Sequence, residues 1–122
     1  MPNANEIEVR AMSDAYEAAL LANDIDAMNG VFWESPEVLR FGVGDAQVGI
    51  DEVVAWRAAA IPVSPRRRIT SRTILELAPG VVAVDLTFRN GDEHAIGRQS
   101  QTWVRGDDGW RIARAHVSVI PA

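Results

Sequence analysis

The second half of the chain is a succession of strand-like segments joined by tight turns. These segments are rich in Val, Ile, Thr and Trp, which favour strands, and they cover residues 69–77, 81–89, 96–105 and 110–120. The connections between them are short and turn-forming: Pro79-Gly80, Asn90-Gly91 and Asp107-Asp108-Gly109. Because turns of this kind join antiparallel neighbours, the pattern predicts a four-stranded antiparallel meander.

The N-terminal part of the chain has helical periodicity instead. Apolar side chains recur at three- and four-residue spacing within residues 5–22: Met12, Tyr16, Ala19 and Leu20. This spacing predicts an amphipathic helix. Asp24 is placed to cap a short second helix, and the pair Ser35-Pro36 is placed to stop it.

The middle of the chain predicts a small hairpin followed by a third helix. Residues 38–42 alternate between two faces, and 47–48 are expected to return antiparallel to them after a glycine-rich turn. Asp51 is placed to cap a helix through residue 60, with Val53 and Trp56 facing inward. Helices before strands predict one α+β domain over residues 1–122, with N-terminal helices packed on a strongly curved antiparallel sheet. The covered face of such a sheet is concave and is expected to enclose one pocket.

Composition excludes several kinds of chemistry. The chain has no cysteine, and all 12 of its basic residues are arginine, so thiolate and lysine chemistry are excluded. The two histidines, His94 and His116, lack metal-ligand spacing. We therefore expect no metal site.

Charge and hydropathy also limit the partners. A net charge of −5 argues against a nucleic-acid-binding protein. The run Arg66-Arg67-Arg68 is the one basic cluster, and it is interpreted as a solvated strand entrance. The sequence contains no apolar run long enough for a membrane span and no export signal at its N-terminus. These features predict a soluble, cytoplasmic protein that does not bind membranes.

The last two predicted strands carry a family resemblance. GRQSQTWVRGDDGWRIARAHVS, at residues 97–118, resembles the last hairpin of nuclear transport factor 2-like (SnoaL-like) domains. The spacing of its two tryptophans, histidine and serine is also similar to that in the association domain of calmodulin-dependent kinase. Three blocks resemble the AtzH-like family more narrowly: VFWESPEVLRFGVG at 31–44, GIDEVVAWRAA at 49–59 and GRQSQTWVR at 97–105. This resemblance implies a cystatin-like cone.

The same resemblance implies an activity and a catalytic pair. It implies a cofactor-independent decarboxylating amidohydrolase that converts 1,3-dicarboxyurea to allophanate, beside an amidase, in cyanuric acid or related nitrogen catabolism. The family's proposed pair is a tyrosine on the first helix and an arginine on the first strand, which match Tyr16 and Arg40. Arg40 is then expected to hold a carboxylate, while Tyr16 delivers a proton or orients water. From the residues alone, Tyr16 could equally be a core tyrosine bonded to a backbone carbonyl, and Arg40 a surface residue on an edge strand.

Polar stripes on the last two strands supply further candidates. Gln99 and Gln101 share one face, and Arg98, Ser100 and Thr102 share the other, so only one set can line the pocket. The last strand carries its own polar stripe. By similarity to the kinase domain, the candidate substrate contacts are Gln101, His116, Arg98 and Ser118. His116 could equally have a structural role.

Two other functions compete with this one. A ketosteroid-isomerase-like proton transfer would need a carboxylate base, but the first strand offers Arg40, and Asp85 is the only acid within the central strands. A non-catalytic module that assembles with an amidase belongs to a different class. A homodimer is predicted in every case, because curved sheets of this kind often pair through their exposed faces.

Overall fold

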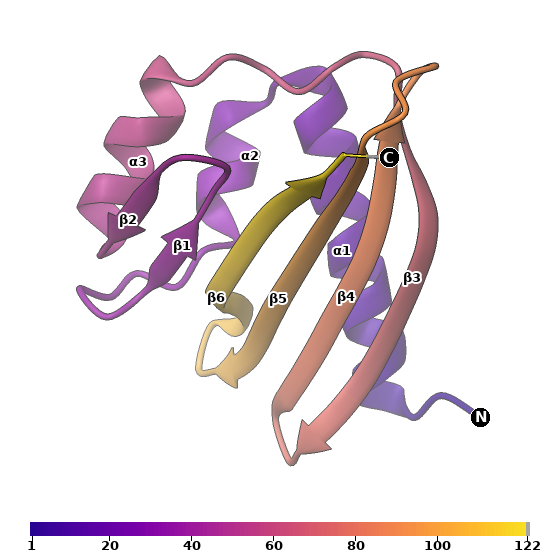
Figure 1. The fold of residues 1–122 in the computed structure, drawn as a ribbon. Helices are drawn as coiled ribbons and strands as arrows, with labels where there is room; N and C mark the ends of the chain where they lie inside the picture. Colours follow the sequence, from indigo (N-terminus) through magenta and orange to yellow (C-terminus); the bar gives the residue numbers. More distant parts are fainter. Residues whose placement is uncertain (122) are drawn as a thin grey trace.

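The computed structural model describes residues 1–121, and Figure 1 shows three helices and six strands. The helices are α1 (Ala4–Ala22), α2 (Ile25–Gly30) and α3 (Ile50–Ala59). The strands are β1 (Leu39–Phe41), β2 (Ala46–Val48), β3 (Arg67–Ala78), β4 (Val81–Asn90), β5 (Ile96–Gly106) and β6 (Gly109–Ile120). The predicted α+β architecture is confirmed.

The six strands form one sheet in the order β2-β1-β6-β5-β4-β3. The antiparallel meander of β3 to β6 is confirmed, and so is the β1–β2 hairpin. One pairing differs from the all-antiparallel prediction, because β1 runs parallel to β6, with Arg40 opposite Ala115. The sheet is therefore mixed. This parallel pairing places the short hairpin beside the last strand of the chain.

The helix ends follow the local sequence with one exception. Asn3 caps α1 and forms a reciprocal pair of hydrogen bonds with Glu6, and the predicted Asp24 cap of α2 accepts from the Ala27 amide at 3.2 Å. Asp51 does not cap α3. Gly49 occupies that position with φ of 87°, a conformation that favours glycine. Asp51 lies in the first turn, where its charge complements the helix dipole.

The helices lie on one side of the curved sheet and leave its other side uncovered (Figure 1). The strands alternate accordingly, so that Val82 and Val84 on β4 and Trp103 on β5 are fully buried beneath the helices. Val9 and Leu20 of α1 pack against this face as part of the same core. No helix within residues 1–121 is both long and apolar enough to cross a membrane.

Candidate functional site

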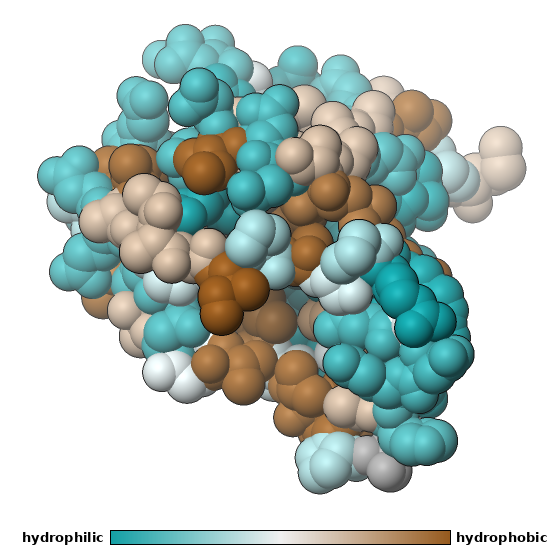
Figure 2. Space-filling view, turned by 90° about the horizontal axis from the view of Figure 1, so that it is seen from above, coloured by the Kyte–Doolittle hydropathy of each residue, from teal (hydrophilic) through white to brown (hydrophobic). Residues whose placement is uncertain are grey.

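A cavity of about 240 Å³ lies between the helices and the inner face of the sheet. This volume is below the roughly 300–1,000 Å³ of pockets for drug-sized ligands, so the cavity suits a small molecule. Its mouth carries exposed apolar residues, Val43 and Ile61 among them. Figure 2, seen from above, shows a hollow bordered by brown apolar side chains, with teal polar groups around them.

The floor of the cavity is a row of residues across three adjacent strands. Ala115 of β6 lies opposite both Arg40 of β1 and Gln101 of β5. Adjacent strands are about 4.8 Å apart, so the backbones of Arg40 and Gln101 are separated by roughly 10 Å. Because Ala115 has only a methyl side chain, the space above it stays open between two polar groups.

Arg40 is buried on this floor, with 9% of its surface exposed. Its Nη1 donates to Asp45 Oδ1 at 2.7 Å and to Gln47 Oε1 at 2.9 Å, and its guanidinium lies 3.5 Å from the centre of the Trp56 ring. Burial lowers the pKa of Arg40, and the hydrogen bond to Asp45 opposes that shift. A Cβ on Gly42 would clash with Asp45 Oδ1, so a larger residue there would displace the carboxylate that pairs with Arg40.

Tyr16 of α1 lines the same cavity and is also buried. Its ring packs edge-on against Phe32, with centroids 6.0 Å apart. Its hydroxyl oxygen accepts a hydrogen bond from Arg57 Nη2 at 3.1 Å. The hydroxyl is therefore bonded to a side chain, not to the backbone carbonyl expected of a core tyrosine.

Arg57 of α3 was missed by the sequence analysis. It is 5% exposed and lines the cavity. Its Nε donates to Asn29 Oδ1 at 3.1 Å, and its Nη1 to Met28 Sδ at 3.2 Å. The signal was present in the sequence, because Arg57 is four residues after the inward-facing Val53 and so shares its helix face.

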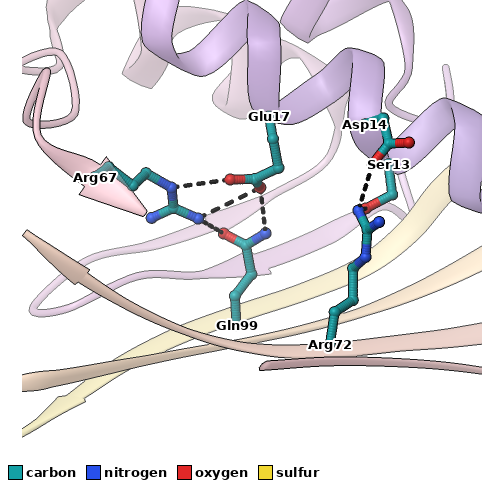
Figure 3. Close-up of polar contacts among 6 residues, drawn as sticks. All are labelled: Ser13, Asp14, Glu17, Arg67, Arg72 and Gln99. Carbon is teal, nitrogen blue, oxygen red and sulfur yellow. Dashed lines mark hydrogen bonds and ion pairs between the residues drawn. The ribbon is translucent and has the colours of Figure 1, made fainter. Parts of the chain in front are cut away.

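Arg67 is also buried in the cavity wall, which corrects the interpretation of the arginine run as a solvated face. Figure 3 shows Arg67 and Gln99 both bonded to the Glu17 carboxylate on α1. Arg67 Nε and Nη2 donate to the two Glu17 oxygens at 2.9 and 3.3 Å, and Gln99 Nε2 donates to Oε2 at 3.1 Å. Arg67 also lies 3.9 Å from the centre of the Phe88 ring. Only its neighbours in the run, Arg66 and Arg68, are exposed.

The three cavity arginines differ in how their charge is balanced. Arg40 pairs with Asp45, and Arg67 pairs with Glu17. Within residues 1–121, Arg57 forms no ion pair with a carboxylate. No aspartate or glutamate of the described residues lines the cavity. The cavity therefore carries one uncompensated positive charge.

Gln101 is held so that its amide nitrogen can serve a ligand. Its Oε1 accepts from Trp103 Nε1 at 3.0 Å, and an indole nitrogen can only donate, which fixes the amide orientation. Gln101 Nε2 makes no hydrogen bond to the described residues and is left as a donor at the cavity. Arg40 and Gln101, the two polar residues of this row, thus both offer hydrogen-bond donors to the cavity.

The other predicted substrate contacts lie on the uncovered face of the sheet. His116 packs edge-on against Phe41, with centroids 5.7 Å apart. Arg98 Nε donates to Ser118 Oγ at 3.1 Å. The structure therefore brings Tyr16, Arg40 and Gln101 to one cavity and places His116, Arg98 and Ser118 outside it.

An isomerase-like proton transfer lacks its carboxylate base among the described residues that line this cavity. Asp85, the acid that an isomerase would need as its base, is exposed on the uncovered face. Among residues 1–121, no three His, Asp or Glu side chains are grouped so that they could hold a metal ion.

Comparisons with known proteins concern the family and the fold. The AtzH-like family model matches residues 3–122. A cystatin-like fold protein from Burkholderia xenovorans is 37% identical, with a TM-score of 0.92 over 97% of this chain and 93% of its own. A protein of unknown function from Pectobacterium atrosepticum is 32% identical, with a TM-score of 0.92 over 98% and 93%. An NTF2-like protein of unknown function from Pseudomonas putida shares the fold at 16% identity, with a TM-score of 0.82 over 97% and 88%. No curated protein matches the sequence.

Proposed function

The chain belongs to the AtzH-like family, and on that premise we propose that it is a cofactor-independent enzyme that removes carbon dioxide from 1,3-dicarboxyurea and releases allophanate. The observation that carries this proposal is the unpaired buried charge of Arg57, in a cavity lined by Tyr16 and Arg40. A buried guanidinium without a counter-ion is costly. A small anion is the partner that would remove this cost.

The donors on the cavity floor favour a carboxylated urea over a neutral amide. Arg40 uses Nη1 for its protein contacts, and its remaining N–H groups are free to grip a carboxylate. Gln101 adds a further donor across the open space above Ala115. A molecule with a carboxylate at each end and a carbonyl between them supplies hydrogen-bond acceptors to Arg40 on one side and to Gln101 on the other.

The proposed reaction requires one proton transfer and one bond cleavage. The bond between nitrogen and one carboxyl carbon breaks, its electron pair stays on nitrogen, and carbon dioxide leaves. Tyr16 donates its hydroxyl proton to that nitrogen and regains a proton from water. Arg40 holds a carboxylate and stabilises the charge that develops during cleavage. Allophanate is the remaining monoanion.

The test uses purified protein and 1,3-dicarboxyurea, with allophanate and carbon dioxide followed by ¹³C NMR. Tyr16→Phe removes the proton donor, and Arg40→Ala removes the guanidinium that binds a substrate carboxylate. Each substitution is expected to lower kcat/KM by about 10²–10⁴-fold. Arg98→Ala is the matched control, because Arg98 is an arginine on the uncovered face, and it is expected to keep wild-type activity. Wild-type activity in either cavity variant would refute the catalytic assignment.

The alternative function, a non-catalytic module that assembles with an amidase, predicts a different result. Such a module would be inert toward 1,3-dicarboxyurea alone and would co-purify with an amidase. Homodimerisation stays a prediction under both functions. Sedimentation of the protein, alone and with a candidate amidase, measures both associations.

A further inference from the structure

The direction of the hydrogen bond between Arg57 and Tyr16 determines where the phenol proton can point. A guanidinium has no acceptor, so Arg57 Nη2 must donate to Tyr16 Oη across their 3.1 Å separation. The Tyr16 proton cannot lie on that side. Within the described part of the chain, no side chain or carbonyl accepts it. The proton is left for a molecule in the cavity.

Arg57 is held in this position from several directions. Asn29 and Met28 of α2 each accept one of its N–H groups. Its guanidinium lies 5.4 Å from the centre of the Phe32 ring and 5.2 Å from that of Trp56. Tyr16 belongs to α1 and Arg57 to α3. The orientation of the Tyr16 hydroxyl is thus fixed by contacts among all three helices.

A purely structural role does not explain this arrangement well. The other two buried arginines of the cavity each have a carboxylate partner, whereas the partners of Arg57 are an amide, a thioether and a phenol. An arginine bonded only to neutral partners keeps the desolvation cost of a buried charge without the compensation that a carboxylate gives. Stability of the fold therefore does not account for the positive charge of Arg57.

We propose that Arg57 is a positioning residue that directs the Tyr16 proton into the cavity and stabilises the phenol oxygen once the proton has left. This inference rests on the proposed decarboxylation. When Tyr16 transfers its proton to the substrate nitrogen, negative charge develops on Oη, next to the Arg57 guanidinium. Donors placed beforehand against a developing charge are worth about 10²–10³-fold in rate. The positive charge of Arg57 also attracts the anionic substrate.

Two substitutions separate the charge of Arg57 from its geometry. Arg57→Met removes both, and we expect kcat to fall about 100-fold and the Kd for malonate, a non-reactive dicarboxylate, to rise about tenfold. Arg57→Lys keeps the charge but not the planar fork, so it cannot bond Asn29 and Tyr16 together. For Arg57→Lys we expect the malonate Kd to stay within about threefold and kcat to fall by about tenfold or more. Arg66→Gln, at an exposed arginine outside the cavity, is the control and should change neither.

A spectroscopic readout makes the test independent of turnover. Tyr16 is the only tyrosine in the chain, so isotope-edited infrared spectra of tyrosine-labelled protein report the C–O stretch of one phenol. We expect this band to shift in Arg57→Met, and on adding malonate to the wild type, but not in Arg66→Gln. Circular dichroism establishes that each variant is folded.

The outcomes separate the two proposals. If the wild type is active but the folded Arg57→Met variant keeps the wild-type kcat, or its Tyr16 band does not shift, the proposed role of Arg57 is refuted. The proposed decarboxylation then still stands. A wild type that is inert toward 1,3-dicarboxyurea, yet shows the band shift and the loss of malonate affinity, overturns the proposed reaction and supports the Arg57–Tyr16 arrangement.

Discussion

Glu17→Gln tests whether the buried carboxylate beside the cavity both supports the fold and limits the charge of the site. The side chains of Arg67 and Glu17 are 5% and 11% exposed, and the carboxylate accepts three hydrogen bonds, two from Arg67 and one from Gln99. Glutamine keeps the shape but removes the charge, which leaves Arg67 as a buried cation without a counter-ion. Breaking a buried pair in this way costs about 3–5 kcal/mol. For a domain of this length that corresponds to a fall in Tm of about 12–20 °C.

The control for this prediction lies one turn away on the same helix. Asp14 pairs with Arg72 at 2.8 Å but is 61% exposed, and Figure 3 shows both pairs together. Asp14→Asn should cost less than about 1 kcal/mol. Urea denaturation at pH 7 measures both variants. If Glu17→Gln is no more destabilising than Asp14→Asn, the argument from burial is wrong.

The same substitution should have an opposite effect on ligand binding. Arg67 lines the cavity, so removing the charge of Glu17 gives the cavity a second uncompensated positive charge. A malonate carboxylate held about 8 Å from the Arg67 guanidinium, at an effective dielectric of about 20, is attracted to it by about 2 kcal/mol. After screening by salt, we expect malonate to bind about tenfold more tightly, as measured by calorimetry below the Tm of the variant. Weaker malonate binding by the folded variant would refute the electrostatic description of the cavity.

Two further predictions concern the fold. Gly97→Ala would place a Cβ in clash with the Phe88 ring, so we expect the free energy of unfolding, measured by urea denaturation, to fall by about 1–3 kcal/mol. Gly30→Ala, with nothing within 4 Å of the new Cβ, is the control and should not lower it. Equal stability of the two variants would contradict the packing argument. The pKa of Glu6 lies below its ordinary value of 4.5, because the backbone amides of Glu76 and then Asn3 donate to its carboxylate. Its stabilising effect is therefore present above about pH 4.5 and is lost as the pH falls further, so the Tm difference between wild type and Glu6→Gln should shrink from pH 7 to pH 3, and a constant difference would refute this.

Local sequence signals predicted most of the fold. The four long strands lie within one or two residues of their predicted bounds, because turn residues and alternation are properties of neighbouring positions. The parallel pairing of Arg40 with Ala115 joins segments far apart in the sequence. Nothing in either segment specifies the direction of its partner, so this pairing could not be predicted locally.

The site was predictable only in part, for related reasons. Tyr16 and Arg40 were named through the family resemblance, and both line the cavity. Arg67 was misread because it stands in a run of three arginines, which is usually solvated, and because its partner Glu17 is 50 residues away. His116 was assigned to the pocket by similarity to the kinase domain, because alternation along the last strand does not show which of its faces lines the pocket. Once Gln101 is seen opposite Ala115, alternation along the strand puts His116 on the other face.

The single unbalanced charge of the cavity also bears on how the site would empty after each turnover. The proposed substrate is a dianion, whereas allophanate is a monoanion and carbon dioxide is neutral. A cavity with one excess positive charge and no acid among its described lining residues attracts the substrate more strongly than either product. Discrimination between substrate and product would then come from net charge, without any moving lid, and affinity for the organic molecule would fall when its second carboxylate is lost.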